Sequence, residues 1–276
     1  MISGKARLAG VLGWPVGHSK SPRLHNHWLA LHGIDGAYVP LPVAPDRLAE
    51  AVRLLQHLNF AGGNVTVPHK EAVLELVDEV APLAARIGAV NTLVIGADGR
   101  ITGINTDAAG FLLNLRETRP DPAAGPAVIL GAGGAARAAC AALLEEGVPE
   151  IRLVNRSLAR AGQLAADLGG PIVPVEWSGR EAALDGATLL VNSTSLGMTG
   201  QPSLEISLDR LPADALVNDM VYAPLETPLL AAARARGNPT ADGIGMLLHQ
   251  ARPGFEAWFG VMPEVTPDIR AMMLAP

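Results

Sequence analysis

The sequence predicts an α/β protein with two domains, of which the second is a Rossmann-like doubly wound nucleotide-binding domain. The chain has 276 residues, which is long for one domain and comfortable for two. Short apolar runs alternate with helical patterns almost throughout, and this alternation indicates mainly parallel strands. One apolar run leads directly into the glycine-rich turn LGAGGAAR at 130–137. These three observations together predict the fold class.

In the first half of the chain, the clearest helix signal is SPRLHNHWLALHG at 21–33. Ser21 can cap this helix, Pro22 suits its first turn and Gly33 ends it. The stretch AVNTLVIGADGRITGINTD (89–107) indicates a hairpin that turns at 97–99. The other elements expected in this half are strands at 7–13, 38–43 and 64–67, and helices at 45–58 and around 70–77.

The loop TRPDPAAGP (118–126) interrupts this pattern, and a second series begins after it. A long amphipathic helix follows that series, and we expect it to return to the first domain. We therefore expect a first domain of residues 1–106 plus 246–276, a nucleotide-binding domain of residues 107–245, and a cleft between them. The second series comprises strands at 127–130, 151–155, 172–175, 188–192 and 215–219, and helices at 134–146 and 157–168.

Composition excludes several classes of protein. Charged residues make up 17% of the chain and the net charge is −6, so no basic footprint for nucleic acid is present. The single cysteine, Cys140, rules out an internal disulfide and fits a reducing cytosol. No apolar stretch predicts a signal peptide or a membrane span. We expect a cytoplasmic protein, monomeric or homodimeric, that acts on a small molecule without nucleic acid or membrane partners.

The glycine-rich turn is the candidate cofactor site. Gly131, Gly133 and Ala136 form a G-x-G-x-x-A pattern that follows a strand and opens a helix. Glycines there allow a tight turn and a close approach of the backbone to a pyrophosphate, which the helix N-terminus favours. Taken alone the pattern is weak, because glycine- and alanine-rich turns without a ligand are common.

The end of the next strand bears on the choice of cofactor. A carboxylate at this point would bind the adenosine ribose of NAD, but the chain has Asn155, Arg156 and Ser157, with Arg160 one turn beyond. An arginine can hold a 2′-phosphate through two hydrogen bonds, whereas an aspartate would repel it. The alternative is that both arginines face solvent at a helix start. NADP is favoured, because a basic first turn opposes the helix dipole unless an anion compensates it.

Three polar clusters in the first half are candidates for substrate binding. Ser19 and Ser21 flank a strand-to-helix turn, where hydroxyls can hold a carboxylate, although Ser21 could simply cap the helix. In GNVTVPHK (63–70), Asn64 and Thr66 would share one strand face and Lys70 would project from the following loop or turn. Here the alternative is a β-forming threonine and an ordinary surface lysine.

Asn91 and Asp107 form the third cluster, on the hairpin and at the start of the helix after it. Asp107 could be no more than a helix cap. All three clusters follow strand ends, where open α/β sheets gather ligands. An amine, a carboxylate and several neutral hydrogen-bonding groups suit a small polyhydroxylated acid.

The motifs of the chain resemble those of the shikimate dehydrogenase family, in the same order, from about residue 8 to residue 260. In that family two α/β domains enclose a cleft, and NADPH reduces 3-dehydroshikimate to shikimate. The resemblance implies that Lys70 and Asp107 are the catalytic pair, with Lys70 as the proton carrier. The matching motifs are GWPVGHSKSP, GNVTVPHK, GAVNT, NTDAAG, GAGGAAR, NRS, NSTSLGM, DMVY and DGIGMLLHQA.

The resemblance also implies the other substrate contacts. Tyr222 and Gln250 come from shorter motifs, and each could be a packing residue instead. The implied set is Ser19, Ser21, Asn64, Thr66, Lys70, Asn91, Asp107, Tyr222 and Gln250.

The cofactor contacts are implied in the same way. Ser157 stands where the family often has threonine, so a hydroxyl is retained. No metal is expected, because the seven histidines are dispersed and no cluster of ligands is evident. Oxidation of quinate, a preference for NAD, and a non-catalytic NADP-binding sensor of the same fold are the alternatives. The implied cofactor residues are Gly131, Ala132, Gly133, Gly134, Ala135, Asn155, Arg156, Ser157, Arg160, Thr194, Met220, Gly243 and Met246.

Overall fold

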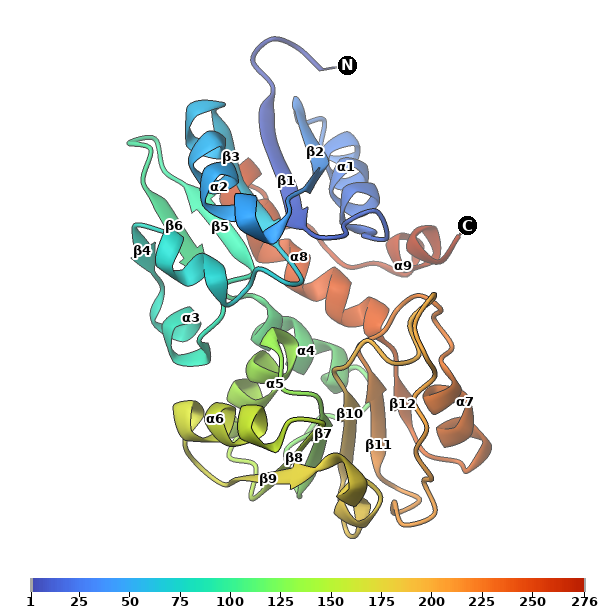
Figure 1. Ribbon diagram of the computed structural model, residues 1–276. Helices are drawn as coiled ribbons and strands as arrows, with labels where there is room; N and C mark the ends of the chain where they lie inside the picture. Colours follow the sequence, from blue (N-terminus) through green and yellow to red (C-terminus); the bar gives the residue numbers. More distant parts are fainter. Residues whose placement is uncertain (1, 276) are drawn as a thin grey trace. The chain divides into compact units, whose positions relative to one another are not determined.

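The computed structural model describes residues 2–275 and divides the chain into two compact units (Figure 1). The first unit comprises Met1–Thr106 and Gln250–Pro276, and the second comprises Asp107–His249. Each unit contains a six-stranded sheet and its own helices. The α/β class expected from the sequence is confirmed.

The sheet of the first unit has the strand order β2-β1-β3-β5-β6-β4. β1 lies parallel to β2 and β3, whereas β5 runs antiparallel to both β3 and β6, so this sheet is mixed. The hairpin predicted around residues 97–99 is present and joins β5 to β6. The strands are β1 (Arg7–Gly13), β2 (Gly36–Pro42), β3 (Phe60–Val65), β4 (Glu79–Val80), β5 (Thr92–Ile95) and β6 (Ile101–Ile104).

Strand β3 differs from the predicted strand at 64–67, because it begins at Phe60 and ends at Val65. Its first half contains two glycines, which resemble a loop in sequence. A Cβ on Gly63 would lie 2.7 Å from the carbonyl oxygen of Gly10, so glycine is required where β1 and β3 approach each other. After Val65 the alternation of faces stops: Val65 is buried in the core, but Val67 is 69% exposed.

The helix predicted at 21–33 is α1 (Ser21–Leu31). Ser21 is its first helical residue and not its cap, so the capping expectation was wrong. The cap position is Lys20, which makes no side-chain capping bond. The other helical segments of this unit are α2 (Leu48–His57), α3 (Pro82–Ile87), α9 (Pro267–Leu274) and the short 3₁₀ turns Pro45–Arg47 and Ala72–Leu76.

The sheet of the second unit is parallel throughout, with the order β12-β11-β10-β7-β8-β9. The order reverses at β7, so the strands run outward from it in both directions, as in a doubly wound fold. Parallel strands are buried on both faces, and every residue of β7, β10 and β11 is buried. The strands are β7 (Ala127–Leu130), β8 (Ile151–Asn155), β9 (Ile172–Glu176), β10 (Leu189–Asn192), β11 (Leu216–Asp219) and β12 (Thr240–Ala241).

The helices of this unit follow its strands in alternation. Cys140 is fully buried in α5, and burial raises the pKa of its thiol to about 12, as expected of a packing residue. Helix α8 crosses the unit boundary, which falls between His249 and Gln250. The helices are α4 (Asp107–Arg116), α5 (Gly134–Glu145), α6 (Leu158–Leu168), α7 (Pro228–Ala235), α8 (Gly243–Phe259) and the 3₁₀ turns Trp177–Gly179 and Ala182–Leu184.

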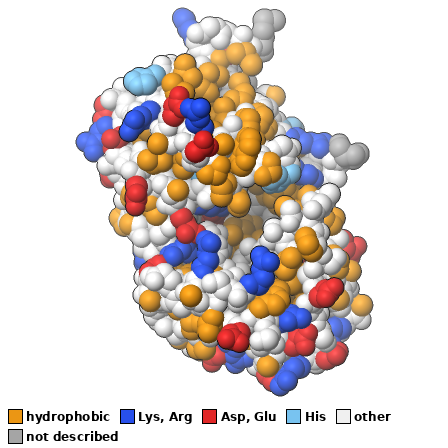
Figure 2. All heavy atoms as spheres, in the orientation of Figure 1, with side chains coloured by type: hydrophobic (Ala, Val, Ile, Leu, Met, Phe, Trp, Pro, Cys, Tyr) orange, Lys and Arg blue, Asp and Glu red, His pale blue; other side chains and the backbone are white. Residues whose placement is uncertain are grey.

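The surface shows no gathering of one charge on the face drawn in Figure 2, where acidic and basic side chains are interspersed with hydrophobic ones. Within residues 2–275, no helix combines the length and the apolar character needed to cross a membrane.

Candidate active site

Four of the first-unit candidates, Ser19, Ser21, Thr66 and Lys70, follow two neighbouring strands. A Cβ on Gly13 would clash with the methyl group of Thr66, and the Trp14 amide donates to the Val67 carbonyl over 3.0 Å. The loop after β1, which carries Ser19 and leads into α1 at Ser21, therefore lies beside the loop after β3, which carries Thr66 and Lys70. The parallel pairing of β1 with β3 causes this arrangement, because the carboxyl ends of parallel strands meet at one sheet edge.

The two serines are hydrogen-bonded within the first loop. The Ser19 hydroxyl accepts from the Ser21 amide over 3.3 Å, and the Ser21 side chain is buried. Tyr38 on β2, a residue that the sequence did not single out, donates through its phenol to Asn64 Oδ1 over 2.6 Å.

Lys70 is held through its backbone and through its neighbour His69. The buried imidazole of His69 bonds the Val43 carbonyl through Nε2 at 2.7 Å, and the Lys70 carbonyl accepts from the Val90 amide over 2.8 Å. Lys70 itself is half-buried in the turn before the segment Ala72–Leu76. The His69 bond ties the turn to the residue after β2, and the Val90 bond sets the Lys70 backbone next to the residue preceding Asn91.

Asn91 lies just before β5, in a polar cluster at the end of the first unit. Its Nδ2 donates to Thr106 Oγ1 over 2.9 Å and to Gln250 Oε1 over 3.1 Å. Its Oδ1 accepts from the Thr106 amide over 2.9 Å. Asn64 belongs to the same polar cluster, because its Nδ2 donates to Thr92 Oγ1 over 3.1 Å. Asn91 and Gln250, far apart in sequence, are direct neighbours in the fold.

Asp107 and Tyr222 belong to the second unit. Asp107 is the first residue of α4, with only 3% of its surface exposed, and Tyr222 is half-buried in the segment after β11. The pairing of Asp107 with Lys70 inferred from the sequence therefore joins residues of the two units, and it stays a prediction.

The glycine-rich turn has the local structure that a phosphate site requires. Gly131 has a φ of +106°, and a Cβ there would lie 2.8 Å from Ser193 Oγ and 3.1 Å from Thr194 Cγ2. Only glycine allows this approach, which brings Gly131 beside Thr194. At Gly133 a Cβ would meet nothing within 4 Å, and the start of α5 has no side-chain cap. The turn therefore presents open space in front of uncapped helical amides, which fits an anion.

The residues after β8 extend this turn. Arg160 Nε donates to the Ala132 carbonyl over 2.8 Å, which ties α6 to the glycine-rich turn. Asn155 Nδ2 donates to the Ser157 carbonyl over 3.0 Å, and the Ser157 hydroxyl caps α6 by accepting from the Arg160 amide over 3.3 Å. The side chain of Arg156 is exposed beside them. Asparagine, serine and two arginines thus stand together next to the turn.

A buried network supports Thr194, one of the implied cofactor residues. Thr194 donates through Oγ1 to Asn192 Oδ1 over 2.7 Å, and Asn192 Nδ2 donates to Asp219 Oδ1 over 2.9 Å. Asp219 also accepts from the Thr227 hydroxyl over 2.6 Å and from the Val221 amide over 3.0 Å. Burial raises the pKa of the Asp219 carboxyl, and these hydrogen bonds act in the opposite direction.

The start of α8 completes this region. A Cβ on Gly243 would clash with the carbonyl oxygen of Met220, so glycine is needed where α8 begins beside the segment after β11. Met220 is itself fixed by its amide, which donates to the Asn192 carbonyl over 3.0 Å. Met246 lies on the first turn of α8 and is buried. Thr194, Met220 and Gly243 are therefore linked through Asn192.

Sequence reasoning missed the residues that orient these side chains. Tyr38 is an aromatic residue in a strand, and Thr92 and Thr106 are β-formers beside asparagines, so each suggests simple packing. Asp219 carried the best signal, because a carboxylate ending an otherwise apolar strand must find buried donors.

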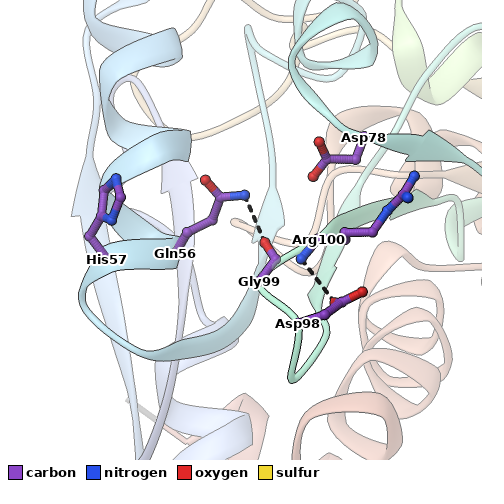
Figure 3. A pocket seen from close by; sticks show the side chains of 6 residues that line it. All are labelled: Gln56, His57, Asp78, Asp98, Gly99 and Arg100. Atoms are coloured by element: carbon purple, nitrogen blue, oxygen red, sulfur yellow. Dashed lines mark hydrogen bonds between the residues drawn. The ribbon is translucent and has the colours of Figure 1, made fainter.

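A separate polar pocket of about 400 Å³ lies in the first unit and shares no residue with the candidate site (Figure 3). It lies between the end of α2 and the β5–β6 turn, where Gln56 Nε2 donates to the Gly99 carbonyl over 2.7 Å. Among the described residues, no three His, Cys, Asp or Glu side chains are placed to hold a metal ion.

The fold and this geometry define a class: a two-unit α/β protein with a dinucleotide-type turn in one unit and a polar cluster at the sheet edge of the other. Three family descriptions match the chain. They are "Shikimate dehydrogenase substrate binding domain" over residues 11–93, "Shikimate / quinate 5-dehydrogenase" over 117–198 and "Shikimate 5'-dehydrogenase C-terminal domain" over 243–273.

Individual relatives agree with the family descriptions. Shikimate dehydrogenase (NADP(+)) of Paramagnetospirillum magneticum is 63% identical over 99% of this chain and 100% of its own length. The protein of the same name from Rhodospirillum rubrum is 62% identical, with 99% of each chain covered. Among solved structures, shikimate 5-dehydrogenase of Thermus thermophilus, in complex with NADP(H) and shikimate, is 37% identical with a TM-score of 0.85 over 97% of both chains. The chain belongs to the shikimate dehydrogenase family.

Proposed function

We propose that this protein catalyses the reversible NADPH-dependent reduction of 3-dehydroshikimate to shikimate, with Lys70 and Asp107 as its proton-transfer pair. The protein is an NADP-dependent oxidoreductase of the shikimate dehydrogenase family, and its relatives carry the name of this activity. The observation that carries the proposal is the polar cluster of the first unit, where Asn64 and Asn91 are linked by hydrogen bonds, directly and through Thr92. We assign the first unit to substrate binding and the second to NADP.

NADPH supplies the hydride to the ketone carbon of the substrate. The protein must then stabilise negative charge on the ketone oxygen and deliver a proton to it. Lys70 is suited to both tasks, because an ammonium group is a hydrogen-bond donor and a proton source. Its backbone is tied to Val90, one residue before Asn91, so its turn is anchored to the same sheet edge.

Asp107 is assigned to orient the amine and to accept a hydrogen bond from a substrate hydroxyl. Its position at the start of α4 suits a carboxylate, because the helix N-terminus stabilises negative charge. Ser19 and Ser21 are assigned to the substrate carboxylate. Asn64, Thr66, Asn91, Tyr222 and Gln250 are assigned to the hydroxyl groups.

The preference for NADP is assigned to the residues after β8. Arg156 is exposed and has no acidic neighbour in the NRS segment, so its guanidinium is available to a 2′-phosphate. Arg160, tied to the Ala132 carbonyl, holds α6 against the turn that we assign to the pyrophosphate. A cytoplasmic location fits a chain whose single cysteine is a buried thiol.

The test is an assay of absorbance at the NADPH band with purified protein. Shikimate is compared with quinate as the substrate, and NADP with NAD as the cofactor. We expect the highest kcat/KM for shikimate with NADP. A higher kcat/KM for quinate would assign the protein to the quinate branch of the family, and no turnover with any pair would support a cofactor-binding sensor.

A further inference from the structure

We propose that Tyr38 and Thr92 are positioning residues for substrate binding, because they orient the amide groups of Asn64 and Asn91 through one continuous, buried hydrogen-bond chain. The inference rests on the proposed function of those asparagines. Neither residue belongs to the set expected from the sequence. Both are fully or almost fully buried, at 1% exposed for Tyr38 and 0% for Thr92.

The orientation of the Asn64 amide is determined by neighbours that can act in only one way. Asn64 Nδ2 lies 3.3 Å from the backbone carbonyl of Asn91, which can only accept, so this atom is the nitrogen. Asn64 Oδ1 therefore faces Tyr38, and the phenol must donate its single proton to it over 2.6 Å. A reversed amide would place its oxygen against the Asn91 carbonyl oxygen, and two acceptors in contact are unfavourable.

The single proton of the Tyr38 phenol is therefore used on Asn64, one of the candidate hydroxyl-binding residues. Burial raises the pKa of Tyr38 well above its ordinary value, so the phenol keeps its proton and its donor role.

The other side of Asn64 continues in the same direction. Asn64 Nδ2 donates to Thr92 Oγ1 over 3.1 Å, and Thr92 donates to Asn91 Oδ1 over 3.0 Å. The Asn91 amide is also fixed independently, because its Oδ1 accepts from the Thr106 amide, which can only donate.

The hydrogen-bond chain ends on the backbone of α8, at the Gln250 carbonyl. Asn91 Nδ2 donates to Thr106 Oγ1 over 2.9 Å, and Thr106 donates to the Gln250 carbonyl over 2.8 Å. Hydroxyl and amide groups alternate, and every donor points the same way from Tyr38 to Gln250. Hydrogen bonds aligned in this manner polarise one another, so removal of one hydroxyl loosens the groups on both sides of it.

The first test is Tyr38→Phe, which removes the hydroxyl and keeps the ring. We expect the KM for shikimate to rise about tenfold, while kcat changes less than about threefold and the KM for NADP is unchanged, because the lost interaction orients groups that bind substrate. The matched control is Trp28→Phe. Trp28 is a buried aromatic residue that packs against His25, and it takes no part in the hydrogen-bond chain. This substitution should lower stability without changing the KM for shikimate.

The second test uses a pair of variants at Thr92. Thr92→Val removes the hydroxyl at nearly constant shape and should raise the KM for shikimate, whereas Thr92→Ser keeps the hydroxyl and should restore it to within about twofold. The pair also covers the case in which Tyr38→Phe does not fold, as judged by circular dichroism. Equal KM values for the valine and serine variants, or a wild-type KM in Tyr38→Phe, would overturn the proposal.

The two tests distinguish a failure of the positioning role from a failure of the proposed function. If the wild-type protein oxidises shikimate and both hydroxyl deletions leave its KM unchanged, the positioning role fails and the function stands. If the wild-type protein does not turn over shikimate, the proposed function fails, and with it the basis for the positioning role.

Discussion

The imidazole of His25 stacks on the phenol ring of Tyr38, with ring centroids 4.1 Å apart and planes inclined by 8°. His25 is fully buried, and neither of its ring nitrogens has a hydrogen-bond partner among the described residues. It contributes a neutral aromatic face to a cluster that also contains Trp28, Phe255 and Trp258. The residue that orients Asn64 is thus backed by a histidine that must remain uncharged.

The pH dependence of stability follows from that burial. Desolvation lowers the pKa of His25 to about 3, whereas the unfolded chain titrates near 6.5. Below pH 6.5 the unfolded state binds a proton that the folded state does not, so stability is lost as the pH falls toward 3. When the pH falls from 7.5 to 5.5, this residue should lower the free energy of unfolding by about 1.4 kcal/mol.

The measurement is urea unfolding of the wild type and of His25→Leu at both pH values. The loss on acidification should be smaller by about 1.4 kcal/mol in the variant, since leucine does not titrate. An identical loss in both proteins would mean that His25 can be protonated in the folded state.

Replacement of the candidate proton donor should slow turnover. Lys70→Ala is expected to lower kcat by roughly two to four powers of ten, with a smaller change in the KM for shikimate, because the proton-transfer group is lost and most binding groups remain. Lys5→Ala, at an exposed lysine near the N-terminus, is the control. Near-normal turnover in Lys70→Ala would remove this residue from the catalytic role.

Cofactor discrimination should depend on the exposed arginine after β8. Arg156→Ala should raise the KM for NADPH by about tenfold or more and leave the KM for NADH nearly unchanged, because only NADPH carries the 2′-phosphate. Initial rates with the two cofactors give the comparison, and Arg53→Ala, at an exposed arginine of α2, controls for net charge. Equal increases for both cofactors would contradict the assignment.

The buried carboxylate of Asp219 should support the nicotinamide side of the second unit. Asp219→Asn would turn an amide NH₂ toward at least one of the three groups that donate to this residue. The free energy of unfolding should fall by about 1–3 kcal/mol, and the KM for NADPH should rise because Thr194 loses support through Asn192.

Urea unfolding and initial rates measure these two effects. Asp214→Asn, at an exposed aspartate just before β11, is the matched control. Wild-type stability in Asp219→Asn would show that the buried carboxyl is already protonated and donates a hydrogen bond itself.

Much of the fold could be predicted, because local pattern and tertiary structure agree in most elements. Strands β1 and β7 have the predicted bounds, since continuous apolar runs ended by turn residues leave little choice. The predicted bounds of β3 were wrong, because its two glycines are explained only by tertiary contacts: Gly62 by the approach of Leu93 and Trp258, and Gly63 by the approach of β1. The short elements α3, α7, α9, β4 and β12 escaped notice, since each is too short for a periodic signal.

In the candidate site, too, features set by local sequence could be predicted, whereas features set by tertiary contacts could not. The glycine-rich turn could be recognised because its requirement is local: a strand, a positive φ at Gly131 and a helix start. The capping expectation for Ser21 was wrong, because α1 begins at this residue and its cap position is Lys20.

The sequence by itself determined the α/β class, the position of the dinucleotide-type turn, the family and the residues that it implies. Those properties depend on short-range patterns and on ordered motifs, which a linear chain displays directly. Only the tertiary structure decided that β5 runs antiparallel to β3, that Gln250 meets Asn91, that Tyr38 bonds Asn64, and that Thr92 links Asn64 to Asn91. Hydrogen bonds between residues far apart in sequence form only when burial removes water and strand pairing sets the register, and no local pattern encodes their direction.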